Sequence, residues 1–178
     1  MNVQEERPAI CVKHPGRCSS SLIRTGPGLG CQKGQIRMLG WLSGTILATY
    51  QRGNRHLIVL RCGSVGYEVN VIQRDWNDIT QHEERAYWIH QVCQNDDTIL
   101  YGFQSLSTRE LFRTLISVNG VGPQVGLALL QECSVEDLVD AIIDADLSLL
   151  SQAQGVGRRT AERITVELRS TLENQRAS

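Results

Sequence analysis

A short glycine pattern occurs twice in the second half of the sequence and is the feature best suited to binding a ligand. Residues 118–123 read VNGVGP, and residues 153–158 read AQGVGR. Glycine accepts positive φ, and because it has no Cβ it lets a ligand approach the main chain closely. When a helix follows such a turn, its first N–H groups have no partner inside the helix, and the positive end of the helix dipole lies behind them. Each pattern therefore predicts a turn that binds phosphate.

Each glycine pattern is expected to lie between two helices, which makes a helix-hairpin-helix motif. Such a motif binds the phosphate backbone of DNA without reading the bases. The valine between the glycines is expected to pack inward, and Arg158 and Arg159 add guanidinium groups that can bind phosphate. One copy alone is equally well explained as a glycine that ends a helix, but two copies in the same context favour DNA binding. The residues predicted to contact DNA are Asn119, Gly120, Val121, Gly122, Gln124, Gly155, Val156, Gly157, Arg158 and Arg159.

The charges are distributed unevenly along the chain, whose formal net charge is −1. Residues 1–37 contain six basic and two acidic side chains, so the remainder is acidic, and its cations are all arginines. This balance argues against DNA binding through bulk charge. The backbone N–H groups of the glycine turns would supply the attraction that lysines otherwise provide. An acidic stretch is interpreted as a solvated face or a side turned away from DNA; its members are Glu132, Glu136, Asp137, Asp140, Asp144 and Asp146.

The elements that must position these turns change in character along the chain. Five short runs rich in β-branched, aromatic and apolar residues predict strands, and the connections leave little room for crossover helices. This favours a five-stranded antiparallel barrel of the OB type. The predicted strands cover residues 41–50, 56–62, 65–72, 86–93 and 98–103.

From residue 104 the apolar residues recur with helical spacing. Ser107 with Glu110, and Ser134 with Asp137, have the spacing of capping boxes that begin helices, and Pro123 suits the first turn of another. Two further helices are predicted over residues 147–153 and 158–172. The predicted fold class is α+β: an OB-type barrel followed by an all-helical tandem helix-hairpin-helix domain. The predicted divisions are a disordered extension at 1–37, the barrel at 38–103 and the helical domain at 104–178.

Composition and missing motifs argue against several classes of protein. The hydrophobic fraction of 41% and the charged fraction of 21% are ordinary for a globular protein. No apolar run approaches the roughly 20 residues of a membrane-spanning helix, and no secretory signal is recognisable, so we expect a cytoplasmic protein without a membrane partner. The sequence contains no Walker A motif, so the chain is not itself expected to be a P-loop ATPase.

One cluster near the N-terminus contains candidate metal ligands. Cys11, His14, Cys18 and Cys31 have the chemistry of zinc ligands, but their spacing matches no common zinc module. We therefore expect no metal or cofactor, and interpret the six cysteines as reduced thiols.

Several further motifs give the sequence a family resemblance. Residues 38–44 read MLGWLSG, residues 65–69 read VGYEV, and residues 100–103 read LYGF. Together with ELF at 110–112 and the two glycine repeats, they resemble bacterial RuvA, the Holliday-junction-binding subunit family of the RuvAB branch-migration complex. The resemblance implies a non-catalytic homotetramer in which each protomer holds one arm of a four-way junction for recombination and repair. It also implies that ATP and Mg²⁺ are used by the partner motor, RuvB.

The sequence departs from that family at both ends and at one hairpin. The family begins where Met38 stands, and it has a third helical domain that the sequence, ending at Ser178, does not contain; we therefore expect no stimulation of RuvB. The resemblance also implies an acidic pin, a Glu-Asp pair near the junction centre, which aligns with Asn95 and Asp96. Asp97 supplies an additional acid, so Asp96 and Asp97 are the predicted pin. The three acidic and amide residues are also ordinary turn formers.

Two other functions remain as alternatives. A helix-hairpin-helix can serve as the clamp of a DNA repair enzyme, a glycosylase or nuclease, which would require a catalytic Asp or Lys or a metal-binding carboxylate cluster. An OB-fold protein that binds single-stranded DNA would display exposed aromatic side chains on the barrel. Comparing a four-way junction, linear duplex and single strand in gel shifts would separate these classes.

Overall fold

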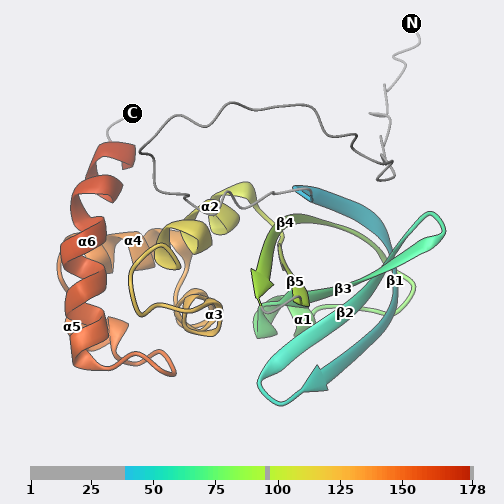
Figure 1. Cartoon of the computed structure of the whole chain (residues 1–178), viewed down its shortest axis with the longest axis horizontal. Coiled ribbons are helices and arrows are strands. Elements are labelled where there is room, and N and C mark those ends of the chain that lie inside the picture. The colour runs from blue at the N-terminus through green and yellow to red at the C-terminus, as the bar shows by residue number, and fades with distance from the viewer. Residues whose placement is uncertain (1–38, 95–96, 177–178) are drawn as a thin grey trace, which may run out of the picture. The chain divides into compact units, whose positions relative to one another are not determined.

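The computed structural model describes residues 39–94 and 97–176. By its internal contacts the chain divides into residues 1–34 and residues 35–178. The predicted extension at 1–37, the cysteine–histidine cluster near the N-terminus and Asp96 lie outside the described residues. Figure 1 shows the described part, in which a barrel precedes a group of helices.

The secondary structure confirms the predicted fold class. The strands are β1 (Trp41–Arg52), β2 (Arg55–Cys62), β3 (Val65–Val71), β4 (Glu84–Gln94) and β5 (Asp97–Phe103). The helices are α1 (Gln73–Asn77), α2 (Leu106–Leu115), α3 (Pro123–Glu132), α4 (Val135–Ile143), α5 (Leu147–Leu150) and α6 (Arg158–Arg176). The three-part domain division stays a prediction, because the barrel and the helices belong to one compact unit.

The five strands close into a barrel in the order β1-β2-β3-β5-β4. Neighbouring strands are antiparallel except β3 and β5, which pair in parallel through Val69 with Leu100 and Asn70 with Tyr101. Fully buried Ile46, Ile58 and Leu60 belong to the core inside. The barrel is the predicted OB-type arrangement, in which alternating apolar residues face inward along each strand.

A short helix that the sequence analysis missed lies between β3 and β4. The predicted strand at 65–72 ends at Val71, and α1 follows. Trp76 on α1 packs against the barrel core and donates a hydrogen bond from Nε1 to the Leu57 carbonyl (3.3 Å). Five residues are too few to show an apolar period, so the sequence pattern does not predict this helix.

The predicted capping box at Ser107 is wrong by two residues. Ser105 is the N-cap of α2 and accepts a hydrogen bond from the Thr108 N–H (3.1 Å), while Ser107 lies inside the helix. Glu110 does not reach back to the cap; its carboxylate pairs with Arg109 and Arg113. Both serines precede the same apolar stripe, so the pattern identifies the helix but not its first residue.

The other predicted helix starts are confirmed. Pro123 is the first residue of α3. Ser134 caps α4 by accepting from the Asp137 N–H (3.1 Å), and its hydroxyl donates to the Asp137 carboxylate (2.7 Å). The predicted helix at 147–153 is shorter, ending at Leu150, whereas the predicted helix at 158–172 extends to Arg176. None of the helices within residues 39–94 and 97–176 is long and apolar enough to cross a membrane.

The barrel and the helices share a core around α2. The Phe112 ring is fully buried and lies 4.8 Å from the Phe103 ring and 5.3 Å from the Tyr101 ring, measured between centroids. Arg109 lies over the Trp88 ring at 5.2 Å and donates to the Gly40 carbonyl (2.9 Å). These aromatic and cation–π contacts attach α2 to β4 and β5.

Candidate nucleic-acid interface

The two glycine turns have the same backbone geometry. Gly120 has φ +88° and Gly155 has φ +84°. In each turn the following valine N–H donates 3.0 Å back to a carbonyl three residues earlier, from Val121 to Val118 and from Val156 to Ala153. Positive φ is the conformation that glycine adopts without strain, so the first glycine of each copy is required by the turn itself. The repeat in the sequence is thus a repeat in structure.

The valines point inward and the glycines lie at the surface. Val121 is 4% exposed and Val156 is 5% exposed, and both belong to the core of the helices. All four glycines of the two patterns are exposed. The inward packing confirms the expectation for the valine side chains, and contact of Val121 and Val156 with DNA stays a prediction.

The second glycine of each copy leads directly into a helix. The Gly122 carbonyl accepts from the Gly126 N–H (3.0 Å), and the Gly157 carbonyl accepts from the Ala161 N–H (3.0 Å). A Cβ built on Gly122 or Gly157 meets no described atom within 4 Å. Each turn therefore presents open space next to the first turn of α3 or α6, where N–H groups and the helix dipole favour an anion.

Contacts that the sequence pattern does not reveal join the two copies. Arg163 on α6 donates from Nη1 to the Asn119 carbonyl (2.9 Å), directly before the first glycine turn. A Cβ on Gly155 would lie 3.4 Å from Val125 on α3. Each copy thus touches the helix of the other copy, which fixes the separation of the two candidate phosphate sites.

The polar side chains predicted to bind DNA are all exposed, and one of them forms an ion pair. Arg158 has an 83% exposed side chain but forms an ion pair with Glu162 (3.0 Å), a partner the sequence analysis overlooked although the i,i+4 spacing was visible. Exposed pairs of this kind are weak, so a phosphate can compete for the guanidinium. Arg159 and Asn119 are exposed. Gln124 is also exposed.

Gln124 connects the first turn to the barrel. Burial raises the pKa of the Tyr101 hydroxyl, while the charge of Arg55 and a hydrogen bond from Gln124 act in the opposite direction. The Gln124 side chain, predicted to contact DNA, therefore has a protein partner on β5. Its contact with DNA stays a prediction.

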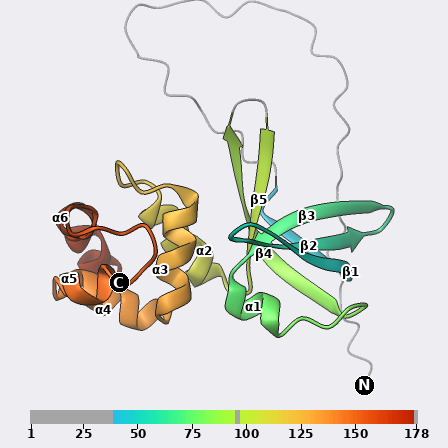
Figure 2. The same cartoon turned by 90° about the horizontal axis from the view of Figure 1, so that it is seen from below.

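The predicted acidic pin is described in part. Asp97 is the exposed first residue of β5 and pairs with Gln94 at the end of β4. Figure 2 shows β4 and β5 as a ribbon that extends beyond the other strands. Asp97 therefore lies at the end of a projecting hairpin, as a pin requires, and its role near a junction stays a prediction.

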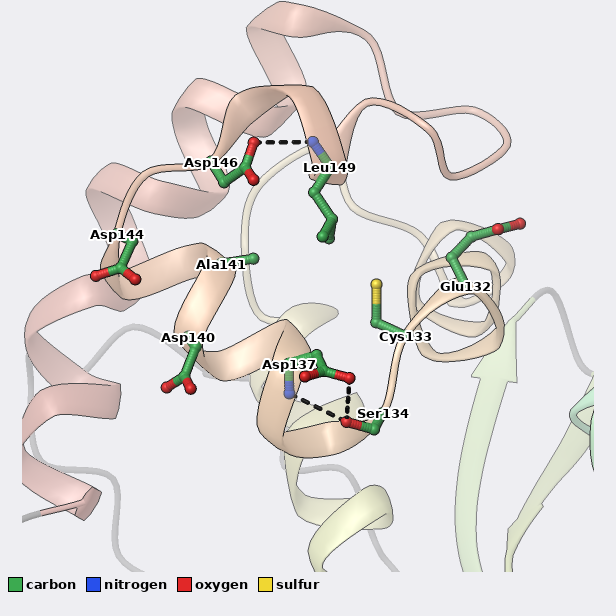
Figure 3. A pocket seen from close by; sticks show the side chains of 9 residues that line it. All are labelled: Glu132, Cys133, Ser134, Asp137, Asp140, Ala141, Asp144, Asp146 and Leu149. Carbon is green, nitrogen blue, oxygen red and sulfur yellow. Dashed lines mark hydrogen bonds between the residues drawn. The ribbon is translucent and has the colours of Figure 1, made fainter.

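The acidic stretch gathers around a surface pocket formed by α4, α5 and the end of α3 (Figure 3). Several of these carboxylates have local structural partners. Asp137 accepts from Ser134, and Asp146 caps α5 by accepting from the Ser148 and Leu149 N–H groups. No group of three His, Cys, Asp or Glu side chains within the described ranges is arranged to hold a metal ion.

Comparisons with known proteins match both halves of the chain. The model of the RuvA N terminal domain matches residues 38–102, and the model of the SAM-like helix-hairpin-helix tandem matches residues 112–170. The protein "Holliday junction branch migration complex subunit RuvA" of Parasynechococcus marenigrum (strain WH8102) is 48% identical over 141 residues, covering 79% of this chain and 69% of that protein.

Relatives with the same name show similar agreement. The protein of Synechococcus sp. (strain WH7803) is 53% identical over 77% of this chain and 64% of its own length. The protein of Prochlorococcus marinus (strain MIT 9313) is 50% identical over 76% of this chain and 60% of its own length. The chain thus spans about 60–69% of these curated relatives. With a closed barrel, two matching glycine turns and this identity along most of its length, the chain belongs to the RuvA family.

Proposed function

We propose that this protein is a non-catalytic DNA-binding subunit that holds four-way junctions during branch migration in recombination and repair. The observation that carries the proposal is the pair of exposed glycine turns, with φ +88° and +84°, each leading into a helix. Family membership supports it, since the relatives are named as subunits of the Holliday junction branch migration complex.

The geometry favours the DNA backbone over the bases. A turn without Cβ atoms next to a helix N-terminus offers N–H groups to phosphate, and phosphate is the same in every sequence. Two such turns, held together by the Arg163–Asn119 hydrogen bond, suit the two phosphate strands of one duplex arm. Recognition would thus depend on the path of the backbone, which differs between a junction and a linear duplex.

The symmetry of the ligand supports a proposed homotetrameric assembly. A four-way junction has four equivalent arms, and one protomer offers sites for one arm. A homotetramer with four-fold symmetry would place one protomer on each arm. The proposed division of labour leaves ATP hydrolysis and Mg²⁺ to the RuvB motor, so this chain needs no cofactor of its own.

The experiment is a gel shift of the purified chain with a four-way junction, a linear duplex of the same sequence and a single strand. We expect the junction to bind at least tenfold more tightly than the duplex, in two junctions of unrelated sequence. Preferential binding of the single strand would favour an OB-fold single-strand-binding protein. Strand cleavage or base release in the same incubations would favour the repair enzyme. Either result would overturn the proposal.

A further inference from the structure

The turn between β1 and β2 reaches the second glycine turn. Asn54, in this turn, donates from Nδ2 to the Gln154 side-chain oxygen (3.1 Å), a contact between residues that are 100 positions apart. Gln154 is the residue directly before Gly155. The barrel therefore contributes a segment to the edge of a proposed phosphate site.

Two arginines flank this turn. Arg52, the last residue of β1, pairs directly with Arg55, the first residue of β2, and both are exposed. Within the residues that the structure describes, neither guanidinium has a carboxylate within 4.0 Å; Glu68 on the adjoining strand accepts a hydrogen bond from Tyr50. Like charges directly opposite on a ladder destabilise it, and an anion between them would remove that cost.

Arg55 also acts electrostatically on a residue of β5. Its charge acts on the Tyr101 hydroxyl, which shares a hydrogen bond with Gln124 in the first turn of α3. The β1–β2 turn is thus connected to the second candidate site through the hydrogen bond from Asn54 to Gln154.

The base of the hairpin is held by α1. The His56 ring lies 5.4 Å from the Trp76 ring, and Trp76 donates to the Leu57 carbonyl (3.3 Å). Burial lowers the pKa of His56, which favours the neutral ring near pH 7. The two arginines are therefore presented from an anchored strand pair, and they supply the positive charge of this turn.

We infer that residues 52–55 form a third phosphate-binding element, in which Arg52 and Arg55 contact the backbone of the DNA arm held by the glycine turns. The inference rests on the proposed junction binding and adds a side-chain cation site from the barrel to it. Asn54 is a positioning residue, which holds the turn against Gln154. Guanidinium groups suit this task because they can bind phosphate through two parallel hydrogen bonds.

The test compares R52A/R55A with the unaltered chain in junction binding between 50 and 200 mM salt. Each lost phosphate contact lowers the log–log salt slope by about 0.9, so the double variant should lose about 2 from the slope. By the same counterion argument, the loss of affinity should be about tenfold larger at 50 mM salt than at 200 mM salt. R61A is the matched control, since Arg61 is an exposed arginine of β2 several residues from the turn. R52K/R55K should keep the slope and lose less affinity.

The outcomes separate this inference from the proposed function. If R52A/R55A folds, as shown by its circular dichroism, and keeps the unaltered affinity and slope, the inference is overturned while junction binding stands. A loss of binding free energy no greater than twice that of R61A would overturn it as well, because the double variant removes two charges and such a loss would reflect net charge alone. Failure of the unaltered chain to bind any junction would overturn both. N54A supplies a second measurement. If Asn54 only positions the turn, N54A should bind the junction more weakly while the salt slope stays unchanged.

Discussion

Alanine at the second glycine of both repeats should weaken DNA binding without unfolding the protein. A Cβ on Gly122 or Gly157 meets no described atom within 4 Å, and neither residue has positive φ. Alanine restricts the unfolded chain, which stabilises by about 0.4–1 kcal/mol, and it is a poorer N-cap than glycine by a similar amount. We therefore expect the melting temperature of G122A/G157A to lie within a few degrees of that of the unaltered chain. The added methyl groups would stand where phosphate approaches the helix N-termini.

Alanine at the first glycine of each repeat should instead cost stability. The left-handed conformation of Gly120 and Gly155 costs a residue with Cβ about 1–2 kcal/mol, so G120A/G155A should lose about 2–4 kcal/mol. For a domain of this size this corresponds to a melting temperature roughly 4–16 °C lower. The contacts of these added Cβ atoms, 3.3 Å to Arg163 and 3.4 Å to Val125, are tight but tolerable.

The assay measures thermal unfolding and junction binding of both pairs side by side. G122A/G157A should bind at least tenfold more weakly, a loss of about 1.4 kcal/mol, with nearly unchanged unfolding. G40A is the matched control, because its Cβ would lie 3.8 Å from Arg109 in ordinary contact and away from both turns. Unaltered binding by G122A/G157A would refute the argument that phosphate approaches the main chain at these glycines.

Three further predictions concern charge and burial. R158A should reduce the salt slope of binding by about 0.9 without changing sequence preference, as fluorescence titration against two unrelated junctions would show; a sequence-dependent loss would contradict backbone recognition. D96N/D97N should keep or tighten junction binding and weaken discrimination against linear duplex in competition gel shifts, because it removes charge that repels phosphates; an unchanged preference would leave these residues as turn formers. Burial raises the pKa of Tyr87 to about 12, so its ionisation favours the unfolded chain once the pH passes the unfolded value of about 10. Urea unfolding at pH 8 and 11 should show a smaller alkaline loss for Y87F than for the unaltered chain, and equal losses would contradict the burial argument.

The sequence predicted those features that depend on local chemistry. The glycine turns repeat because positive φ and close approach require the same residues in both copies, and the strands alternate because one face is buried. Pro123 and Ser134 begin their helices for reasons contained in a few neighbouring residues. Such features need no knowledge of what lies across the fold.

Most of the features that were missed depend on distant partners; the Arg158–Glu162 ion pair, four residues apart on α6, is an exception. The capping serine of α2 is Ser105 because the chain leaves β5 in extended geometry there, which a choice between two nearby serines does not reveal. The hydrogen bonds from Arg163 to Asn119 and from Asn54 to Gln154 join residues far apart in sequence. Strand β1 continues through polar Gln51 and Arg52, where ladder hydrogen bonds rather than an apolar pattern extend it. These contacts exist only after the barrel and helices have packed.

The acidic balance of the helices is compatible with phosphate binding because the charges are separated along α3. Its N-terminus follows Gly122, while Glu132 at its other end lines the acidic pocket together with side chains from α4 and α5. Ten residues of helix place those ends about 15 Å apart, beyond the screening length of roughly 8–10 Å at physiological salt. Asp140 is further compensated by its ion pair with Arg176 (2.6 Å). The N-terminal end of α3 therefore experiences the helix dipole more strongly than the distant carboxylates, so the net charge does not argue against the proposed phosphate binding.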